Sequence, residues 1–299
     1  MTEPSQDLPF GSYRLSPGRE WLRRRAEYLP DGRLGRMGAS LIRRALIGEG
    51  RTPVDIEVFP SINARLFPST NRCEKRAVVG VKFFDREERD FMAKRIAHAP
   101  RDTVAVVDLG ANVGLYGLSA VAAGRNAGKG VKVLAVEPDT ETRRRLERNI
   151  AFSGARDTFA VVAAGVGARR GTAYLAGHAT NRGQHRVVDG GSDSTDGGAG
   201  HSRIEILPLL DICRTHGFDR IDILKIDVEG FDYDVLEAFY ASAPPSLWPE
   251  AVIVEVGRGE AGRDENDAPV VKLLGSHGYD LAQRTKLNAL MVARPGSKR

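Results

Sequence analysis

Cysteine and long apolar runs are the two features that this 299-residue sequence most clearly lacks. Its two cysteines, Cys73 and Cys213, lie far apart and form no Cys-x-x-Cys motif. Since the N-terminus carries no apolar run either, this usage predicts a protein of the reducing cytoplasm. No stretch approaches the roughly 20 apolar residues that a membrane-spanning helix needs. We therefore expect a soluble, cytoplasmic protein.

Aromatic residues are also sparse, at 7%, whereas the hydrophobic share of 41% and the charged share of 28% are ordinary for a globular protein. Wholesale disorder is thereby excluded. The net charge of +5 comes entirely from residues 19–44, which hold eight arginines and three acidic residues. A DNA-binding protein normally spreads positive charge over its reading face, so this distribution disfavours nucleic acid as the partner.

Residues 1–75 are predicted to form an N-terminal extension. Three prolines among polar residues predict a poorly ordered tail over the first twenty positions. Two helical patterns follow, broken at Pro30-Asp31-Gly32. The second has apolar residues at helical spacing, namely Leu34, Met37, Leu41, Ile42, Ala45 and Leu46. The next predicted elements are a hairpin of Val54–Phe59 and Ala64–Phe67, a strand Val78–Phe84 and a helix Arg86–His98.

From Thr103 onwards, strands alternate regularly with helices. Apolar runs such as VAVVDL and VIVEV are typical of strands buried on both faces of a sheet, and the alternation implies a parallel sheet with right-handed crossovers. The predicted strands are Thr103–Leu109, Val131–Glu137, Thr158–Ala163, Thr172–Leu175, Arg203–Leu207, Ile221–Asp227, Ala251–Val256, Tyr279–Gln283 and Ala289–Ala293. The short link between the last two predicts an antiparallel hairpin.

We therefore expect an α/β fold with a doubly wound, mostly parallel sheet over residues 76–299. A mobile insertion is predicted at 177–202, because its Gly-, Asp- and Ser-rich part, Asp189–Ser202, cannot bury a core. Two interpretations of this segment stay open: a passive surface loop, or a lid that orders over a substrate.

The segment Val106–Gly114 (VVDLGANVG) ends the first strand of the alternating region, where open α/β sheets bind ligands. Gly110 allows a tight turn, and Gly114 lets the next helix start close to the sheet. Asp108 is placed to meet an ammonium group. Asn112 stands where a dinucleotide fingerprint has its middle glycine, which disfavours pyrophosphate binding.

Glu137 ends the second strand, where a carboxylate can accept both hydroxyls of a ribose. Together with Asp108, Gly110 and Gly114 it fits S-adenosylmethionine better than NAD. The run Ala163–Gly167 ends the third strand, and Ala164 is expected to let the backbone approach the adenine. A simple turn is the alternative interpretation of that run.

Several longer sequence blocks carry a specific resemblance to a known protein family. VVDLGANVGLYGLSA, LAVEPD, RLERNI and LLDI, followed by ILKIDVEGFDYDVLEAF, resemble the FkbM-type S-adenosylmethionine-dependent methyltransferases. The resemblance runs from about Arg76 to about Ala293. It implies a class I methyltransferase fold with a seven-stranded sheet and a terminal hairpin, and O-methyl transfer, often to hydroxyls of sugars or natural products.

Three carboxylates near two neighbouring strand ends are the candidate catalytic residues. Asp227 and Glu229 belong to LKIDVEG, and Glu255 ends VIVEV. A sugar hydroxyl is a poor nucleophile until it begins to lose its proton, and a positioned base contributes roughly 100- to 10,000-fold. Asp227 is the first candidate for that base, or for holding the hydroxyl. Glu229 and Glu255 come second, and Glu229 has helix capping as its alternative role.

The same carboxylates could hold a divalent cation, but no His or Cys ligand spacing accompanies them, which disfavours a metal. Lys225, on the strand before Asp227, is expected to pair with a carboxylate or to lie at the crevice edge, because a buried unpaired lysine is costly.

The stretch Ala179–Val187 (ATNRGQHRV) partly resembles the Asn-x-Gly acceptor-side loop of the family, with Asn181 in place. Gln184, His185 and Arg186 replace the small hydroxyl residues that usually follow. Asn181 and His185 are therefore candidate substrate-binding residues, and His185 could also act as a base.

The leading hypothesis is an S-adenosylmethionine-dependent methyltransferase that methylates a hydroxyl on a sugar, glycan or natural product by in-line transfer. One alternative is an NAD-dependent oxidoreductase. Another is a peripheral membrane or nucleic-acid binding module built on the basic segment. Residues 19–47 predict contact with a membrane surface or self-association, with a solvated face as the alternative.

Overall fold

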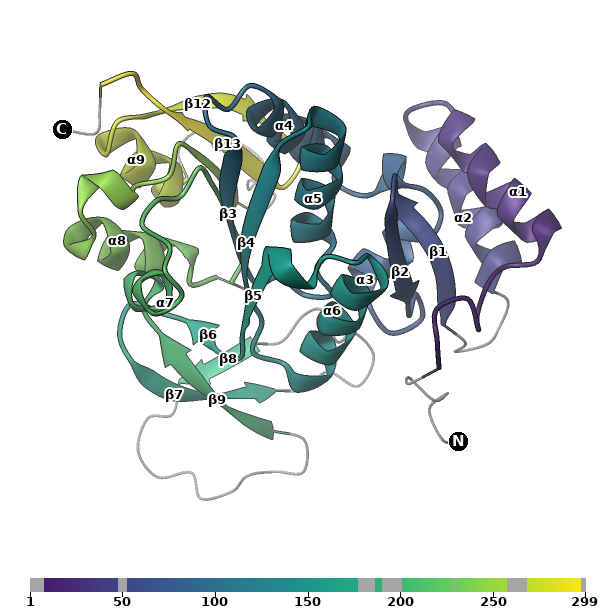
Figure 1. Ribbon diagram of the computed structural model, residues 1–299, viewed down its shortest axis with the longest axis horizontal. Helices are drawn as coiled ribbons and strands as arrows, with labels where there is room; N and C mark the ends of the chain where they lie inside the picture. The colour runs from purple at the N-terminus through teal and green to yellow at the C-terminus, as the bar shows by residue number, and fades with distance from the viewer. Residues whose placement is uncertain are drawn as a thin grey trace.

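The computed structural model describes residues 8–47, 53–176, 186–189, 201–228, 230–256 and 268–296 (Figure 1). Its main element is a seven-stranded sheet of order β12-β13-β11-β10-β3-β4-β5. The strands are β3 (Thr103–Leu109), β4 (Gly130–Val136), β5 (Phe159–Val162), β10 (Ile223–Ile226), β11 (Ala251–Glu255), β12 (Tyr279–Arg284) and β13 (Asn288–Ala293). All pairings are parallel except those of β13 with β11 and β12. The predicted doubly wound α/β fold and its terminal hairpin are confirmed.

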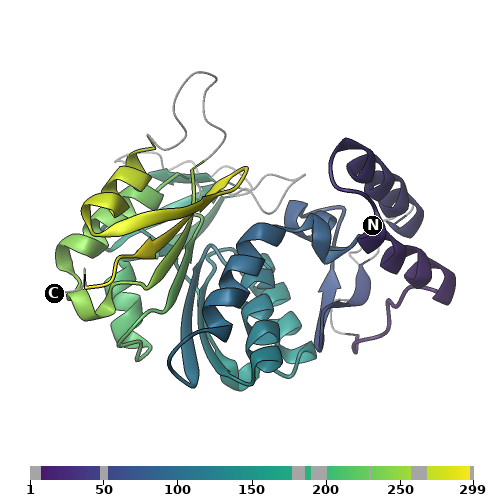
Figure 2. The same ribbon diagram turned by 90° about the horizontal axis from the view of Figure 1, so that it is seen from above.

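Helices cover both faces of this sheet (Figure 2). One face carries α4 (Arg86–Ala97), α5 (Leu115–Ala127) and α6 (Thr140–Phe152). The other carries α7 (Leu209–Thr215), α8 (Asp232–Ser242) and α9 (Pro269–Ser276). Side chains of β3 alternate between the two layers: Val104 and Val106 join the core on the α5 side, and Val107 joins the core on the α8 side. This double burial explains why the strand is apolar along its whole length.

A second, four-stranded sheet of order β6-β9-β7-β8 lies below the main sheet in Figure 1. Its strands are β6 (Gly165–Val166), β7 (Gly171–Ala176), β8 (Arg186–Asp189) and β9 (His201–Leu207). The predicted strands Thr172–Leu175 and Arg203–Leu207 are therefore confirmed as the cores of β7 and β9, which pair antiparallel. The sequence did not reveal β6 or β8. Apart from β8 and the first residues of β9, the predicted insertion lies outside the described residues.

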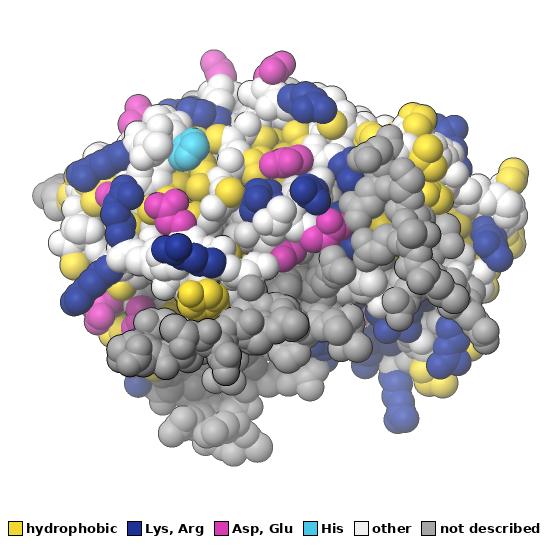
Figure 3. Space-filling model, turned by 90° about the horizontal axis from the view of Figure 1, so that it is seen from below, with side chains coloured by type: hydrophobic (Ala, Val, Ile, Leu, Met, Phe, Trp, Pro, Cys, Tyr) yellow, Lys and Arg dark blue, Asp and Glu magenta, His cyan; other side chains and the backbone are white. Residues whose placement is uncertain are grey.

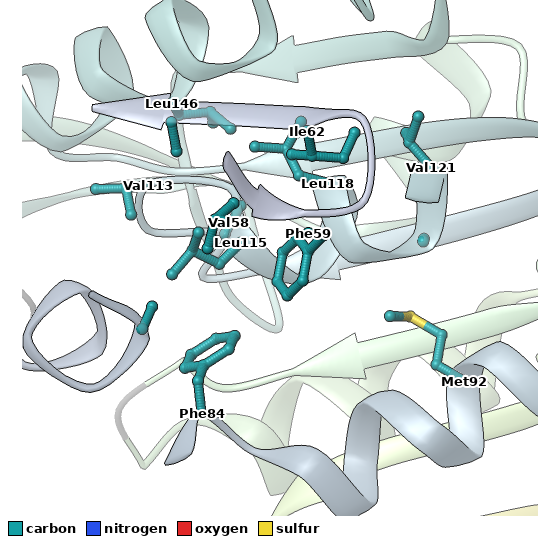
Figure 4. Packing of buried hydrophobic residues seen from close by; sticks show 14 of the residues in the cluster. Val58, Phe59, Ile62, Phe84, Met92, Val113, Leu115, Leu118, Val121 and Leu146 are labelled. Carbon is teal, nitrogen blue, oxygen red and sulfur yellow. The ribbon is translucent and has the colours of Figure 1, made fainter. Parts of the chain in front are cut away.

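The N-terminal extension contains α1 (Pro17–Arg25), α2 (Arg33–Ile47) and the predicted hairpin, now β1 (Val54–Phe59) and β2 (Ile62–Leu66). The hairpin packs on the outer side of the α5 and α6 layer. Figure 4 shows Val58 and Ile62 of the hairpin beside Leu115 and Leu118 of α5. The extension and the sheet region thus share one hydrophobic core.

The predicted disordered tail is wrong for residues 8–20, because a buried ion pair holds this segment. Arg65 and Asp55 are fully buried, with Arg65 Nε 2.7 Å from Asp55 Oδ1. The Arg65 guanidinium also donates to the carbonyls of Leu8 and Pro9. In return, Asp55 Oδ2 accepts from the N–H of Gly11 at 2.7 Å. Such long-range side-chain contacts leave no local pattern in the sequence.

The predicted strand Val78–Phe84 is also wrong. The chain instead forms α3 (Arg72–Ala77), followed by a 3₁₀ turn at Val81–Phe83. Asn71 begins α3, because its side-chain oxygen accepts from the N–H groups of Cys73 and Glu74. Val78 keeps the right-handed helical conformation as the C-cap of α3, and Gly80 has a φ of 151°, so the backbone here turns instead of forming the extended strand that the apolar residues indicate.

The apolar stripe of α2 is only partly buried. Leu46 is in the core, but Leu34, Met37 and Leu41 are exposed. At the end of the molecule that holds α1 and α2, Figure 3 shows hydrophobic side chains among lysines and arginines. Predicted contact with a membrane surface or a second copy stays a prediction, and this face is where it would be made. Within the described ranges, none of the helices combines the length and apolarity needed to cross a bilayer.

We predict that Asp55→Ala lowers the free energy of unfolding by about 3–5 kcal/mol, because it leaves the buried Arg65 guanidinium without its counterion. Urea unfolding followed by circular dichroism measures this loss. Asp90→Ala is the matched control, since its ion pair with Arg86 is exposed, and its unfolding midpoint should stay close to that of the wild type. Equal effects of the two substitutions would contradict the prediction.

Candidate active site

The loop after β3 turns sharply at Gly110, which has a φ of 73°. A Cβ atom there would lie 2.0 Å from the carbonyl oxygen of Asp227. Any residue with a side chain would therefore clash, and only glycine lets the ends of β3 and β10 come this close. At Gly114, with a φ of 84°, a Cβ would lie 2.3 Å from Leu146 of α6. The tight turn predicted at Gly110 is confirmed, whereas the close neighbour of Gly114 is a side chain of α6 and not the sheet.

Between these glycines, Asn112 adopts the left-handed conformation with a φ of 51°. Its N–H donates to Glu137 Oε2 at 2.8 Å, and its side-chain oxygen accepts from Asn71 Nδ2 at 2.7 Å. A second amide supports the same loop, since Asn149 Nδ2 donates to the carbonyl of Val113. Asn71 and Asn149 are functional supports that sequence reasoning missed, although Asn149 lies within the RLERNI block.

Glu137 is 6% exposed and stands directly after β4. Its second oxygen accepts from the N–H of Asp139 at 3.0 Å. Burial raises the pKa of Glu137 to about 7, although the N–H groups of Asp139 and Asn112 act in the opposite direction. The carboxyl therefore changes its charge near neutral pH.

Lys225 of β10 is buried and connects two carboxylates. Its Nζ lies 3.4 Å from Asp227 Oδ2 and 3.8 Å from Asp108 Oδ1, above the ring of Tyr116. It also donates to the carbonyl of Gly110 at 3.3 Å. Burial lowers the pKa of Lys225, but Asp227 and Asp108 outweigh it, so the pKa lies above its usual range. The pairing expected for this lysine is confirmed.

Asp108 is 1% exposed, and neither of its carboxylate oxygens has a hydrogen-bond partner among the described residues. Burial raises its pKa, although the charge of Lys225 opposes the shift. Lys225 thus lies between this carboxylate and the crevice. Asp108 is not part of the wall of the pocket described below, and its predicted contact with an ammonium group stays a prediction.

Asp227 and Glu255 come together because β10 and β11 are parallel neighbours that end at the same edge. The Asp227 side chain is 41% exposed, so a ligand can reach it. Partial burial raises its pKa, but Lys225 and a hydrogen bond with Glu255 hold it below its usual range. Asp227 and Glu255 therefore form one polar pair at this edge of the pocket. Glu229 lies outside the described residues.

One pocket of about 600 Å³ joins these groups. Gly110, Asn112, Glu137 and Ala164 line one part of it, and Lys225, Asp227 and Glu255 line another. Figure 3, which views the molecule from below, shows basic and acidic side chains next to each other near the middle of this face. The pocket continues along α2, α3 and the β12–β13 turn, a wall that the sequence did not reveal.

The predicted substrate-binding residues Asn181 and His185 lie outside the described residues. Among the described residues, no group of three or more His, Cys, Asp or Glu side chains is arranged to hold a metal ion. The chemistry available at the pocket is therefore that of an ionised aspartate, a buried lysine and a carboxyl that titrates near neutral pH.

We predict that Lys225→Met lowers the free energy of unfolding by about 3–5 kcal/mol at pH 8, because Asp108 and Asp227 are left without a counterion. Without Lys225, burial raises the pKa of Asp108 and Asp227 in the folded variant. The folded variant therefore still binds protons at pH values at which its unfolded chain has released them. The loss should therefore shrink at pH 5. Urea unfolding at both pH values checks this, with the exposed Lys94→Met as control. A loss of equal size at both pH values would contradict it.

Two curated proteins are similar to this chain in sequence. The methyltransferase sdnD of Sordaria araneosa is 30% identical over 214 residues, which are 63% of this chain and 78% of sdnD. The AMB antimetabolite synthetase AmbE of Pseudomonas aeruginosa is 27% identical over 215 residues, and the matched region is 62% of this chain but 10% of AmbE.

Two solved structures are weakly similar. The methyltransferase FkbM of Methylobacillus flagellatus KT has a TM-score of 0.42 and 15% identity, covering 92% of this chain and 57% of that one. A SAM-dependent methyltransferase of Agrobacterium tumefaciens has a TM-score of 0.46 and 11% identity, covering 82% and 71%. The family profile "Methyltransferase FkbM domain" matches residues 108–281, from Asp108 in β3 to Leu281 in β12. Since this match spans more than half of the chain, the protein belongs to the FkbM methyltransferase family.

Proposed function

We propose that the protein is an S-adenosylmethionine-dependent O-methyltransferase whose acceptor is a hydroxyl of a sugar, glycan or natural product. The observation that carries this proposal is the continuous pocket, which runs from Glu137 to the Asp227–Glu255 pair. A cofactor bound at Glu137 and an acceptor bound at Asp227 would share that space. Family membership supports methyl transfer and speaks against the alternative of an NAD-dependent oxidoreductase.

The residues at the cofactor end fit S-adenosylmethionine. Glu137 offers a buried carboxylate for the ribose hydroxyls, and the separate loops that hold Asn112 and Ala164 let backbone approach the nucleoside. A volume of about 600 Å³ is in the range of pockets that enclose small ligands. When bound, the cofactor supplies an electrophilic methyl group on a sulfonium ion.

At the acceptor end, Asp227 is ionised at neutral pH because its pKa is low. It can accept a hydrogen bond from the acceptor hydroxyl and orient the oxygen for attack. The bond from this oxygen to the methyl carbon forms as the carbon–sulfur bond breaks. The hydroxyl becomes far more acidic during this step, so even a carboxylate of low pKa can take its proton.

The name of one relative supports a natural product as the acceptor. AmbE is, by its name, a synthetase of an antimetabolite, which agrees with a natural product as the acceptor. The predicted acceptor-side residues Asn181 and His185 remain part of the proposal as sequence-based candidates.

Calorimetric titration with S-adenosylhomocysteine tests the cofactor. Because burial raises the pKa of Glu137 to about 7, the free protein holds it mostly protonated at pH 6 and mostly ionised at pH 8. The ionised form accepts both ribose hydroxyls, so affinity should rise about tenfold between these pH values. Glu137→Gln should bind weakly and lose most of this dependence. If the wild type does not bind S-adenosylhomocysteine at about 1 mM ligand, the proposal is wrong.

Asp227→Asn should abolish methyl transfer and leave the affinity for S-adenosylhomocysteine within about threefold of the wild type, because the change removes the base without removing the side chain. Mass spectrometry of metabolites and glycans from cells that express each variant detects transfer as a gain of one CH₂. The exposed Asp219→Asn is the control. If Asp227→Asn instead loses its affinity for S-adenosylhomocysteine, Asp227 belongs to the cofactor side of the pocket.

A further inference from the structure

We propose that the acceptor is anionic and carries a phosphate, sulfate or carboxylate group that binds a basic wall of the pocket. The basic wall comprises six side chains that line the pocket: Arg36, Arg43, Arg72, Lys75, Arg76 and Lys286. This inference rests on the proposed function, since it describes the acceptor end of the same site.

Three elements that are distant in the sequence supply the basic wall. Arg36 and Arg43 come from α2, Arg72 begins α3, and Lys286 stands in the turn between β12 and β13. Figure 2 shows the tip of that hairpin, in yellow, directed toward the side of the molecule on which the N-terminal helices lie. The convergence is thus a property of the tertiary structure.

Few of these charges are neutralised. Arg76 pairs with Asp85 at 2.6 Å, and Arg43 donates to the hydroxyl of Ser40 at 3.0 Å. The other four, Arg36, Arg72, Lys75 and Lys286, form no ion pair or hydrogen bond with the described part of the chain. They stand at the solvent-exposed part of the pocket.

Seven basic and four acidic side chains line the pocket, and each acidic one already has a partner within the protein. Asp85 is held by Arg76, Asp227 by Lys225, and Glu137 accepts the N–H groups of Asn112 and Asp139. Glu255 shares its hydrogen bond with Asp227. The basic wall therefore keeps a positive potential that the protein itself does not cancel.

Chemistry then selects the acceptor class. Guanidinium groups bind phosphate and carboxylate through paired N–H donors, and a cleft lined by one sign of charge concentrates the opposite ion. A neutral sugar would gain no binding affinity from the four unpaired cationic side chains. An oxyanion on the basic wall would anchor the acceptor while its hydroxyl reaches Asp227.

Calorimetry with two simple probes tests the inference. Pyrophosphate and malonate, a dianion with two carboxylates, are titrated separately into full-length protein saturated with S-adenosylhomocysteine. The pocket variant is R36Q/R72Q. The matched control is R33Q/R44Q, which removes the same charge from exposed arginines of α2 that do not line the pocket.

At least one probe should bind the wild type, and R36Q/R72Q should weaken that binding about tenfold or more, whereas R33Q/R44Q should change it less than about twofold. The tighter probe indicates phosphate or carboxylate as the recognised group. Equal weakening by both variants, or no binding of either probe at about 10 mM, would overturn the inference. Unchanged binding of S-adenosylhomocysteine to both variants shows that they are folded. If the wild type fails to bind it, the proposed function itself fails.

Discussion

The ammonium group of Lys225 is the interaction on which the rest of the site depends. It lies between Asp108 on β3 and Asp227 after β10, so it joins the ends of two adjacent strands from opposite parts of the sequence. Three buried or half-buried ionisable groups would be unstable separately, and Lys225 stabilises both carboxylates. This arrangement keeps Asp227 ionised, which the proposed role in methyl transfer requires.

Backbone packing reinforces the same junction. Gly110 lets the β3 loop contact the carbonyl of Asp227. The N–H of Asn112 in turn donates a hydrogen bond to Glu137. Asn71, from the N-terminal region, fixes the side chain of Asn112. The N-terminal extension is therefore part of the candidate site. It supports the loop that carries the candidate cofactor site, and it forms a wall of the same pocket.

Much of the fold could be predicted because the strands are buried on both faces and show this as continuous apolar runs. The positions of Asp227, Glu255, Glu137 and Ala164 at the pocket followed from the rule that parallel strands end at one edge. Prediction failed where long-range polar contacts or the local backbone conformation decide the structure. Arg65 and Asp55 order a segment that looks disordered, and the backbone turns at Gly80 within the apparent strand Val78–Phe84.

The sequence by itself determined the α/β order of elements, the family and the carboxylates at the strand ends, because periodicity and motifs are local properties of the chain. Only the tertiary structure decided that Asp108 lies beneath Lys225 rather than in the pocket wall. It also gathered basic residues from α2, α3 and the last hairpin into one wall. Contacts between residues so far apart depend on how the layers pack, and no local pattern encodes them.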